Sequence, residues 1–332
     1  MTAAFKPKVS SPTGSCPIAR VIRNLRKGDG MPREKKAQRI SRRRFLRLGC
    51  GVLVGGAATC ALGPVYATQV EPRWIEVTRL DVPLPGLPEA LDRFTITQLS
   101  DLHLGPHVSG GDVRRSVEIA NGLGADLIVL TGDFVYRSAG YSAACAQELA
   151  SLRARYGVYA VLGNHDVWTD ADEVAGNLAG AGVVVLRNER RALEVGDTRL
   201  WLLGIEDTGH TGGFFGDFRV IWREAADALA ALLEGIAAKE PRLLLVHNPD
   251  FTEMLPEGRV DLAVCGHTHG GQVRLPFIGA PVVPSCFGQK YVSGLVQGPS
   301  TLVYVNRGIG LIAPPVRFNC RPEITRLRLR RA

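Results

Sequence analysis

The chain has 332 residues, 45% of them hydrophobic and 22% charged, a composition typical of a globular protein with one large or two modest domains. Its net charge of +8 arises at the beginning: the first 67 residues hold 14 of the 40 Lys and Arg and 2 of the 32 Asp and Glu, so they carry +12 and the remainder carries −4. Because the remainder shows no basic stripe or aromatic platform, we expect no nucleic-acid partner.

Residues 1–67 are predicted to be an export leader. The sequence from Ser41 to Arg47 reads Ser-Arg-Arg-Arg-Phe-Leu-Arg and precedes an uncharged run, residues 48–67, which ends in the cleavage-site pattern Val-Tyr-Ala. This arrangement is typical of a twin-arginine signal. It predicts the twin-arginine translocase as a partner and a location in the periplasm or on the outer face of the cytoplasmic membrane. Met31 is an alternative start, and an uncleaved run would leave a weakly hydrophobic membrane anchor.

Residues 68–93 are expected to be a Pro-rich approach segment with an edge strand at 74–80, and residues 94–330 to be the main domain. In that domain, short apolar runs alternate with amphipathic ones, the pattern of an α/β fold. The expected helices lie at 111–123, 141–156, about 170–180 and 219–237. The expected strands lie at 94–100, 126–131, 159–162, 182–187, 190–195, 198–205, 243–246, 260–265, 301–306 and 324–329. The last of these is basic on one face, which indicates a solvated sheet edge rather than a binding surface.

Five of the expected strands end in polar side chains of the kinds that bind metals. His267 and His269 stand one residue apart, directly after the run 260–265, and side chains at i and i+2 of an extended segment point to the same side. In open α/β sheets, ligands collect at the carboxyl ends of strands, and imidazole suits divalent transition metals. We therefore expect one metal site that draws on five of the seven histidines. Its candidate residues are Asp101, His103, Asp133, Asn164, His165, His247, His267 and His269.

The order of these motifs resembles the calcineurin-like metallophosphoesterases over residues 94–330. The motifs are Asp-x-His at 101–103, Gly-Asp at 132–133, Gly-Asn-His-Asp at 163–166, His247 and Gly-His-Thr-His at 266–269. The sequences that follow His269, and Asn-Arg-Gly-Ile-Gly at 306–310, are similar to an exported or membrane-associated bacterial phosphodiesterase branch. The resemblance implies an α/β fold, a four-layer α/β/β/α sandwich with two mixed β-sheets.

The resemblance also implies two divalent metal ions that share Asp133. One ion would be held by Asp101, His103, Asp133 and His269. The other would be held by Asp133, Asn164, His247 and His267. Mixed nitrogen and oxygen ligands suit Mn, Fe, Zn or Co, and the sequence leaves the choice among them open. Such a pair of ions can activate a hydroxide for in-line attack on phosphorus.

The resemblance gives His165 a catalytic role without metal contact. Its imidazole would stabilise developing charge or protonate the leaving oxygen, and Asp166 would bond to it and fix its orientation. A turn-capping carboxylate is the alternative for Asp166. His107 either faces the entrance or is a solvent residue, and His210 either lines the substrate opening or is peripheral. Arg307 either contacts phosphate or is an ordinary loop arginine.

One departure bears on the substrate. The protein-phosphatase branch of the family reads Gly-Asp-x-Val-Asp-Arg-Gly, whereas residues 132–138 read Gly-Asp-Phe-Val-Tyr-Arg-Ser. Tyr136 replaces the acid and Ser138 the second glycine, which argues against a dedicated phosphoserine or phosphothreonine phosphatase. Phe134, Tyr136 and Gly-Phe-Phe at 213–215 either offer apolar surface to a bulky or acylated diester or are ordinary packing residues.

We therefore expect a metal-dependent phosphoesterase that acts on phosphodiesters or pyrophosphates, either small or lipid-linked. Association with the membrane or the cell wall is left open. One alternative is a UDP-sugar-lipid pyrophosphohydrolase, which the export signal disfavours. Another is a non-catalytic metal-binding protein of the cell envelope, which the complete ligand set disfavours. The sequence does not decide whether the cysteines outside the leader, at positions 145, 265, 286 and 320, form disulfides.

Overall fold

The computed structural model describes residue 43 and residues 62–209, 218–256 and 260–332. The chain divides into two units, residues 1–56 and 57–332, and all elements below belong to the second unit. The predicted leader before residue 62, His210 and the aromatic pair at 214–215 lie outside the described residues. The export signal therefore remains a prediction.

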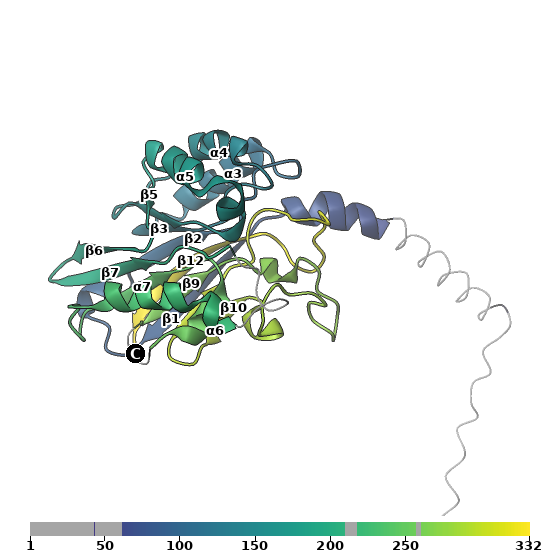
Figure 1. The fold of residues 1–332 in the computed structure, drawn as a ribbon. Coiled ribbons are helices and arrows are strands. Elements are labelled where there is room, and N and C mark those ends of the chain that lie inside the picture. The colour runs from purple at the N-terminus through teal and green to yellow at the C-terminus, as the bar shows by residue number, and fades with distance from the viewer. Residues whose placement is uncertain (1–42, 44–61, 210–217, 257–259) are drawn as a thin grey trace, which may run out of the picture. The chain divides into compact units, whose positions relative to one another are not determined.

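The first sheet has six strands in the order β1-β12-β2-β3-β4-β5. Strands β2 to β5 are parallel, whereas β12 runs antiparallel to β2 and parallel to β1. The sheet is therefore mixed, and the carboxyl ends of β2, β3 and β4 meet at one edge (Figure 1). The strands are β1 (Glu76–Leu84), β2 (Thr95–Leu99), β3 (Leu127–Thr131), β4 (Val158–Val161), β5 (Val184–Val185) and β12 (Glu323–Arg331).

The second sheet also has six strands, in the order β10-β11-β9-β8-β7-β6. Strands β7, β8, β9 and β11 are parallel, and the outer strands β6 and β10 are antiparallel to their neighbours. The strands are β6 (Glu189–Val195), β7 (Thr198–Gly204), β8 (Arg242–Leu245), β9 (Leu262–Cys265), β10 (Gly294–Gln297) and β11 (Leu302–Val305). The sequence analysis did not predict β10.

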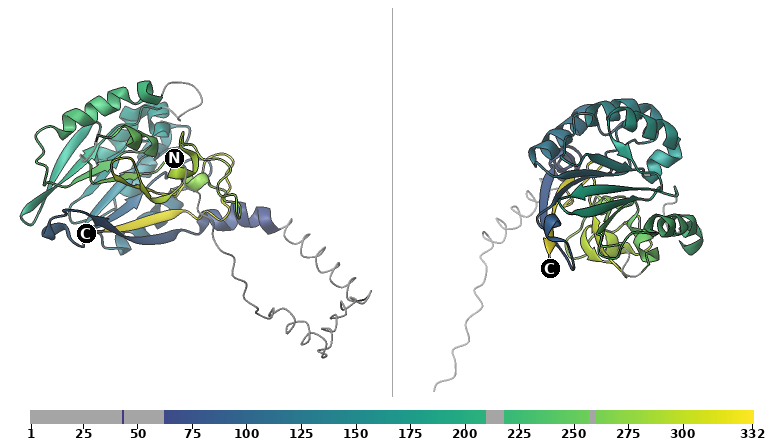
Figure 2. Two further views of the ribbon diagram at one scale, coloured as in Figure 1. Left: turned by 90° about the horizontal axis from the view of Figure 1, so that it is seen from below. Right: turned by 90° about the vertical axis from the view of Figure 1, so that its left-hand side faces the viewer.

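Helices cover the outer face of each sheet (Figures 1 and 2). The first sheet carries α3 (Gly110–Gly122), α4 (Ser142–Leu149) and α5 (Asn164–Gly180), and the second carries α6 (Phe218–Ile221) and α7 (Arg223–Leu233). Short helical turns lie at Tyr66–Val70, Glu71–Arg73, Glu89–Leu91, Ala139–Tyr141, Pro249–Met254, His269–Gly271 and Gly288–Tyr291.

Three hydrophobic cores separate the four layers. Successive side chains of a strand point to opposite faces, and β3 shows this directly: Ile128 and Leu130 pack under the helices, whereas Val129 packs between the sheets. On β8, Leu245 also packs between the sheets, while Leu244 packs under α7. Strands that are buried on both faces are continuous apolar runs, as the sequence shows. The predicted α/β/β/α sandwich with two mixed sheets is confirmed.

The final strand is not the solvated edge that its arginines suggested. β12 lies inside the first sheet because β1 pairs with its outer side, from Glu76 opposite Glu323 to Leu84 opposite Arg331. The edge is β1, the strand expected at 74–80. The basic face of β12 is partly neutralised by neighbours, since Arg328 donates to both carboxylate oxygens of Asp81 at 2.7 Å.

The segment before β1 is fastened to the body of the second unit. The Glu71 carboxylate is fully buried and accepts the backbone N–H of Asn319, at 2.9 Å, and that of Cys320. The backbone N–H of Arg317 donates to the Ala67 carbonyl at 2.9 Å.

Within the described ranges, the cysteines at 145, 265, 286 and 320 are free thiols. No helix in the described part of the chain is both long and apolar enough to cross a membrane.

This contact predicts a stability effect. Glu71→Ala leaves two N–H groups without their acceptor, so we expect the free energy of unfolding to fall by about 1–3 kcal/mol in urea titrations followed by circular dichroism. The matched control, Glu89→Ala at an exposed position, should change it by no more than about 0.5 kcal/mol. Equal effects of the two substitutions would show that the segment is not fastened through Glu71.

Candidate metal centre

The predicted metal ligands all lie where the carboxyl ends of the two sheets meet. Those from the first sheet follow β2, β3 and β4, and those from the second sheet follow β8 and β9. Each of the seven side chains is buried: Asp101, His103, Asp133, Asn164, His247, His267 and His269. The fold therefore brings together the whole set that the motifs indicated.

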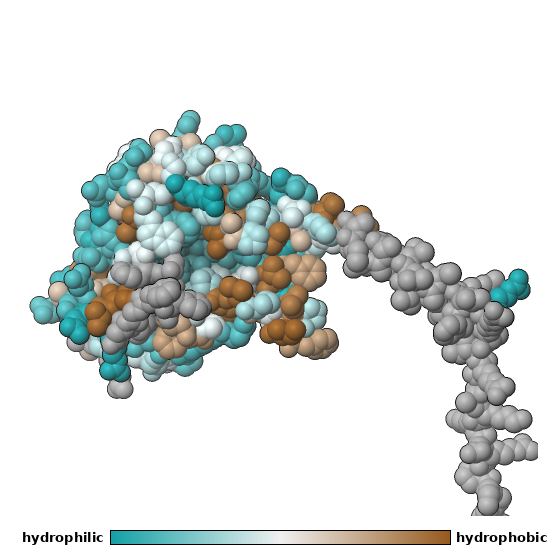
Figure 3. Space-filling model, turned by 45° about the vertical axis from the view of Figure 1, so that its right-hand side comes forward, coloured by the Kyte–Doolittle hydropathy of each residue, from teal (hydrophilic) through white to brown (hydrophobic). Residues whose placement is uncertain are grey.

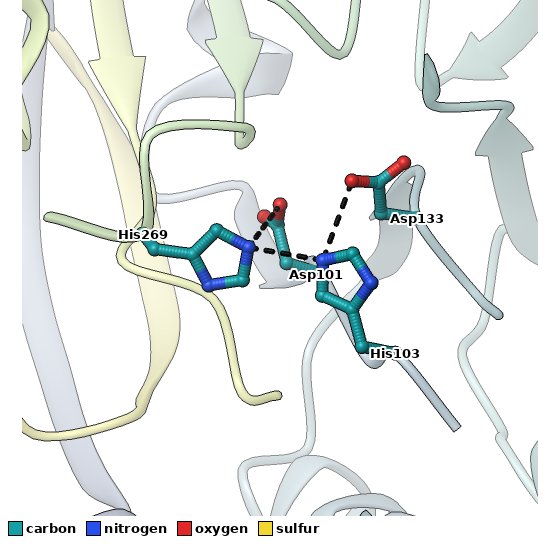
Figure 4. A group of neighbouring side chains, drawn as sticks. All are labelled: Asp101, His103, Asp133 and His269. Atoms are coloured by element: carbon teal, nitrogen blue, oxygen red, sulfur yellow. Dashed lines mark hydrogen bonds and ion pairs between the residues drawn. The ribbon is translucent and has the colours of Figure 1, made fainter. Parts of the chain in front are cut away.

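One group of donors comprises Asp101, His103, Asp133 and His269, whose ligand atoms all lie within 4.8 Å of one another (Figure 4). His103 Nε2 lies 3.3 Å from Asp133 Oδ2, and His269 Nε2 lies 3.3 Å from Asp101 Oδ1. The two imidazole Nε2 atoms face each other at 2.9 Å. Two nitrogens and two carboxylates that converge on one buried point form a donor set that fits a divalent transition metal.

A second group of donors continues from the same carboxylate. His247 Nε2 lies 3.2 Å from Asp133 Oδ2 and 3.3 Å from His267 Nδ1, which in turn lies 2.8 Å from Asn164 Oδ1. Asp133 Oδ2 thus lies beside an imidazole nitrogen from each group.

The orientation of His247 is fixed from behind. Its Nδ1 lies 2.6 Å from the Thr131 carbonyl oxygen. A carbonyl can only accept a hydrogen bond, so Nδ1 carries the proton and Nε2 faces Asp133. A backbone partner of this kind on the far nitrogen is the usual support of a metal-ligating histidine.

The electrostatics of the site also favour a cation. Burial lowers the pKa of His103 and His267 to about 3, which leaves these imidazoles in the neutral form that binds metals. Burial raises the pKa of Asp101 to about 7, and the nearby charge of Asp133 adds to the rise. Burial acts in the same direction on Asp133, but His247 and His103 outweigh it and hold its pKa well below the ordinary value. The buried carboxylates of Asp101 and Asp133 lie close enough to repel each other, and a divalent ion between them would relieve the repulsion.

Residues 94–271 match the family described as calcineurin-like phosphoesterases. The chain belongs to this family. It is 34% identical to the uncharacterized metallophosphoesterase YkuE of Bacillus subtilis, over 87% of this chain and 97% of YkuE. It is 32% identical to phosphodiesterase YaeI of Escherichia coli, over 87% of this chain and 99% of YaeI. A transmembrane protein with metallophosphoesterase domain from Danio rerio is 30% identical, over 84% of this chain and 62% of that protein.

The protein is therefore a metallophosphoesterase, a hydrolase that acts on phosphoric esters. Family membership and the buried Asp and His cluster together indicate divalent metal binding. A catalytically idle binding protein, the alternative from another class, does not agree with this assignment.

Five of the seven predicted ligands have a left-handed backbone. Their φ angles are positive although none is glycine: 52° at Asp101, 49° at His103, 57° at Asp133, 70° at His267 and 51° at His269. Each such residue costs about 1–3 kcal/mol and persists only where its surroundings enforce it. This backbone conformation directs side chains from successive loop positions into one small volume. Sequence periodicity carries no signal for it.

Asp166 does not orient His165, contrary to the expectation. Its carboxylate is fully buried and accepts four backbone N–H groups, at 2.8–3.2 Å, from Asp133, Phe134, Val135 and Gly163. Among the described residues, no hydrogen bond joins Asp166 to the His165 ring. The bond from Gly163 agrees with the turn-capping alternative, whereas the motif could not reveal the other three, which come from a loop some thirty residues earlier. Asp166 is a positioning residue for Asp133.

The glycines of these motifs are required by close backbone approach. A Cβ added at Gly163 would lie 2.6 Å from the backbone nitrogen of Asp133, and one added at Gly132 would lie 2.7 Å from His247 Nδ1. Either contact is far below van der Waals distance and involves groups that hold the metal ligands. The spacing Gly-Asp followed by Gly-Asn thus reflects two loops pressed against each other at Asp133.

His165 lies beside the donors and is half-buried. Its backbone N–H donates to Asp133 Oδ1 at 2.9 Å, and its ring centroid lies 4.7 Å from that of His103. The rings of Tyr136 and Trp168 lie on other sides of it, with centroids at 5.3 and 4.7 Å. The sequence analysis missed Trp168, although its position three residues after His165 at the start of a helix places both on one face.

The structure places neither of the two remaining described candidates among the donors. His107 is exposed, with its ring 6.1 Å from that of Tyr136. Arg307 donates to Glu323 at 3.0 Å and to Glu76 at 2.9 Å, so its guanidinium is neutralised by carboxylates rather than presented to phosphate.

A supporting residue that the sequence analysis missed is Arg317. Its fully buried guanidinium donates to the carbonyls of Cys320, Arg307, Gly308 and Gly310. The loop that it fixes packs against the metal-binding loop, where Gly310 N–H donates to the Asp101 carbonyl at 2.6 Å. Nothing in the local sequence distinguishes this arginine from a surface residue.

The role of Asp166 can be tested by metal content. Asp166→Asn would place an amide N–H₂ against backbone N–H donors, so we expect the Asp133 loop to shift and the protein to retain fewer metal ions per chain. His165→Asn, one residue away, should leave metal content unchanged, because its ring is not a predicted ligand. Elemental analysis after dialysis measures both. Full retention of metal by Asp166→Asn would contradict the positioning role.

Proposed function

We propose that this chain is a phosphodiesterase that works with two divalent metal ions and acts outside the cytoplasmic membrane. The observation that carries the proposal is the position of Asp133 Oδ2, which lies 3.3 Å from His103 Nε2 of one donor group and 3.2 Å from His247 Nε2 of the other. A carboxylate oxygen beside imidazole donors from two groups is what a shared ligand of two cations requires.

In this proposal, one ion is held by the donors from β2 and β3 with His269, and the other by Asp133 with Asn164, His247 and His267. Bound there, divalent cations supply activation of a water molecule and neutralisation of the phosphoryl oxygens. Mn, Fe, Zn and Co all suit these donors. The residues of the chain supply the geometry, because the loops and the two glycines fix where the donors lie.

His165 is the residue that we assign to the leaving group. In hydrolysis, the water oxygen forms a bond to phosphorus, the bond from phosphorus to the leaving oxygen breaks, and that oxygen takes a proton. The His165 ring is half-buried beside the donors and is held between Tyr136 and Trp168, so it can deliver this proton or stabilise the charge that it would neutralise.

The replacement at Tyr136 supports a diester substrate over a protein phosphate. Its side chain is buried, and its hydroxyl accepts the backbone N–H of Ala313 at 3.2 Å. An apolar ring therefore borders the site where the protein-phosphatase motif has a carboxylate. The similarity to the E. coli protein named phosphodiesterase YaeI supports the same choice. A pyrophosphate substrate, including a UDP-sugar-lipid, remains the alternative.

Activity measurements on the full chain test this proposal. After chelation, re-addition of Mn, Fe, Zn or Co should restore hydrolysis of bis(4-nitrophenyl) phosphate to a greater extent than hydrolysis of 4-nitrophenyl phosphate. His165→Ala should lower kcat by roughly 10²–10⁴-fold while two ions stay bound, because a proton donor is lost. Asp133→Asn should lose both turnover and the two-ion stoichiometry. Absence of turnover with every metal, in protein that holds two ions, would refute the proposal.

The location outside the membrane is tested separately. Replacement of Arg42 and Arg43 by lysine keeps the charge of the leader but removes the paired guanidinium groups, so we expect the protein to remain in the cytoplasmic fraction. The same replacements at Arg20 and Arg23, outside the motif, should leave export intact. Cell fractionation and immunoblotting give the readout. Export of the Arg42 and Arg43 variant would contradict twin-arginine transport.

A further inference from the structure

An uncharged, exposed segment lies next to the metal centre. Residues 275–289, between Arg274 and Lys290, contain no charged side chain. Phe277 is fully exposed, Ile278 is 69% exposed and Val282 is 74% exposed. Figure 3 shows hydrophobic side chains gathered on the face that it turns toward the viewer. Contiguous exposed apolar side chains are unusual on a soluble surface and mark a site of interaction.

Backbone hydrogen bonds hold the turn that presents Phe277. Leu275 N–H donates to the Gly279 carbonyl at 2.8 Å, and Gly279 N–H returns a bond to the Leu275 carbonyl at 3.0 Å. The φ angle of Phe277 is 67°, a left-handed conformation that points its ring away from the body. The fold thus holds a large apolar side chain in water at a fixed position.

An apolar groove of about 260 Å³ connects this segment to the metal centre. Its lining includes Thr268 and the predicted metal ligand His269, and its walls are almost entirely aliphatic. Gln272 holds the far wall in place, since its amide side chain donates to the Ile312 carbonyl and accepts the Ile312 N–H. The residues that give the groove its apolar character are Val273, Pro281, Val282, Pro284, Ile312 and Val316.

The same face is tied to the end of the predicted leader. Phe318, which is exposed, pairs through its backbone with Gln272 and Arg274, at the start of the uncharged segment. The neighbouring Arg317 bonds to the Ala67 carbonyl. The point at which the apolar run of the leader ends is thus attached to the face that carries the groove.

We propose that residues 275–289 dock on a phospholipid bilayer and that the groove holds an alkyl or acyl chain of the phosphodiester substrate. This rests on the proposed function. A bilayer fits better than a protein partner because the groove lining is almost entirely aliphatic and includes His269, so an apolar chain held there would lie beside the donor group. An apolar groove beside a phosphoester site matches a substrate with an aliphatic chain. The absence of charge over residues 275–289 is what entry into the interfacial region of a membrane requires.

Docking is tested by fluorescence quenching on the full chain. Phe277→Trp should be quenched and blue-shifted by vesicles of phosphatidylglycerol and phosphatidylcholine with brominated acyl chains. Val184→Trp, on β5 at the edge of the first sheet and outside residues 275–289, is the control and should be unaffected. The leader is identical in both proteins, so any tethering by it is equal. Equal quenching of the two variants would overturn the docking proposal.

The groove is tested by binding of dodecyl phosphate and ethyl phosphate to metal-loaded protein in calorimetry. Methylene burial predicts that dodecyl phosphate binds at least about tenfold more tightly. Val316→Asp, or Val282→Asp if the first variant fails to fold, should bring the ratio of the two affinities toward one, whereas Val184→Asp should not. Equal affinity of the wild-type protein for the two phosphates would overturn the groove assignment.

Neither readout depends on turnover. Hydrolysis of ethyl 4-nitrophenyl phosphate, measured in parallel, reports the proposed function by itself. Failure of that hydrolysis with intact docking and groove binding would reject the phosphodiesterase proposal and leave a lipid-binding surface. Successful hydrolysis with failed quenching and an equal affinity for the two phosphates would reject the membrane inference alone.

Discussion

The carboxylate of Asp133 is the constraint around which this molecule is arranged. It is an anion in a dry interior, and such a group is tolerated only where charge and hydrogen bonds surround it. One oxygen accepts the backbone N–H of His165, and the other faces the imidazoles of His103 and His247. Behind it, Asp166 holds the backbone N–H groups of the same loop. Two glycines allow the loops to approach closely enough for these contacts.

The remaining architecture follows from what this carboxylate needs on either side. Donors from the first sheet alone would leave one side of Asp133 Oδ2 open, and the second sheet closes it with His247. The two-sheet sandwich is therefore the scaffold that supplies a donor to each side of one oxygen. The left-handed residues at the strand ends concentrate strain at this point, and the three hydrophobic cores outweigh it.

Local signals in the sequence predicted most of the elements and the place of the site, whereas the four-layer sandwich and the set of seven ligands came from the resemblance of the ordered motifs to a known family. Apolar runs reveal buried strands, and polar letters at their ends reveal the site. The sequence could not show that β12 lies inside its sheet, because the pattern of its arginines is the same whether its outer side pairs with β1 or faces water. The hydrogen bonds of Asp166 to the Asp133 loop, and those of the Arg317 guanidinium to four backbone carbonyls, were also missed. Both join segments that are distant or irregular, and neither has a periodicity.

The distances along the chain between partners in the site have a consequence for how the protein assembles. Asn164 and His267 are 103 residues apart, Thr131 and His247 are 116 apart, and His103 and His269 are 166 apart. Contacts between such remote segments form late, after the closure of long loops. Neither donor group is complete in the chain up to residue 240. Neither donor group can form until the two halves of the chain have joined, so a metal ion held by either group would report that they have.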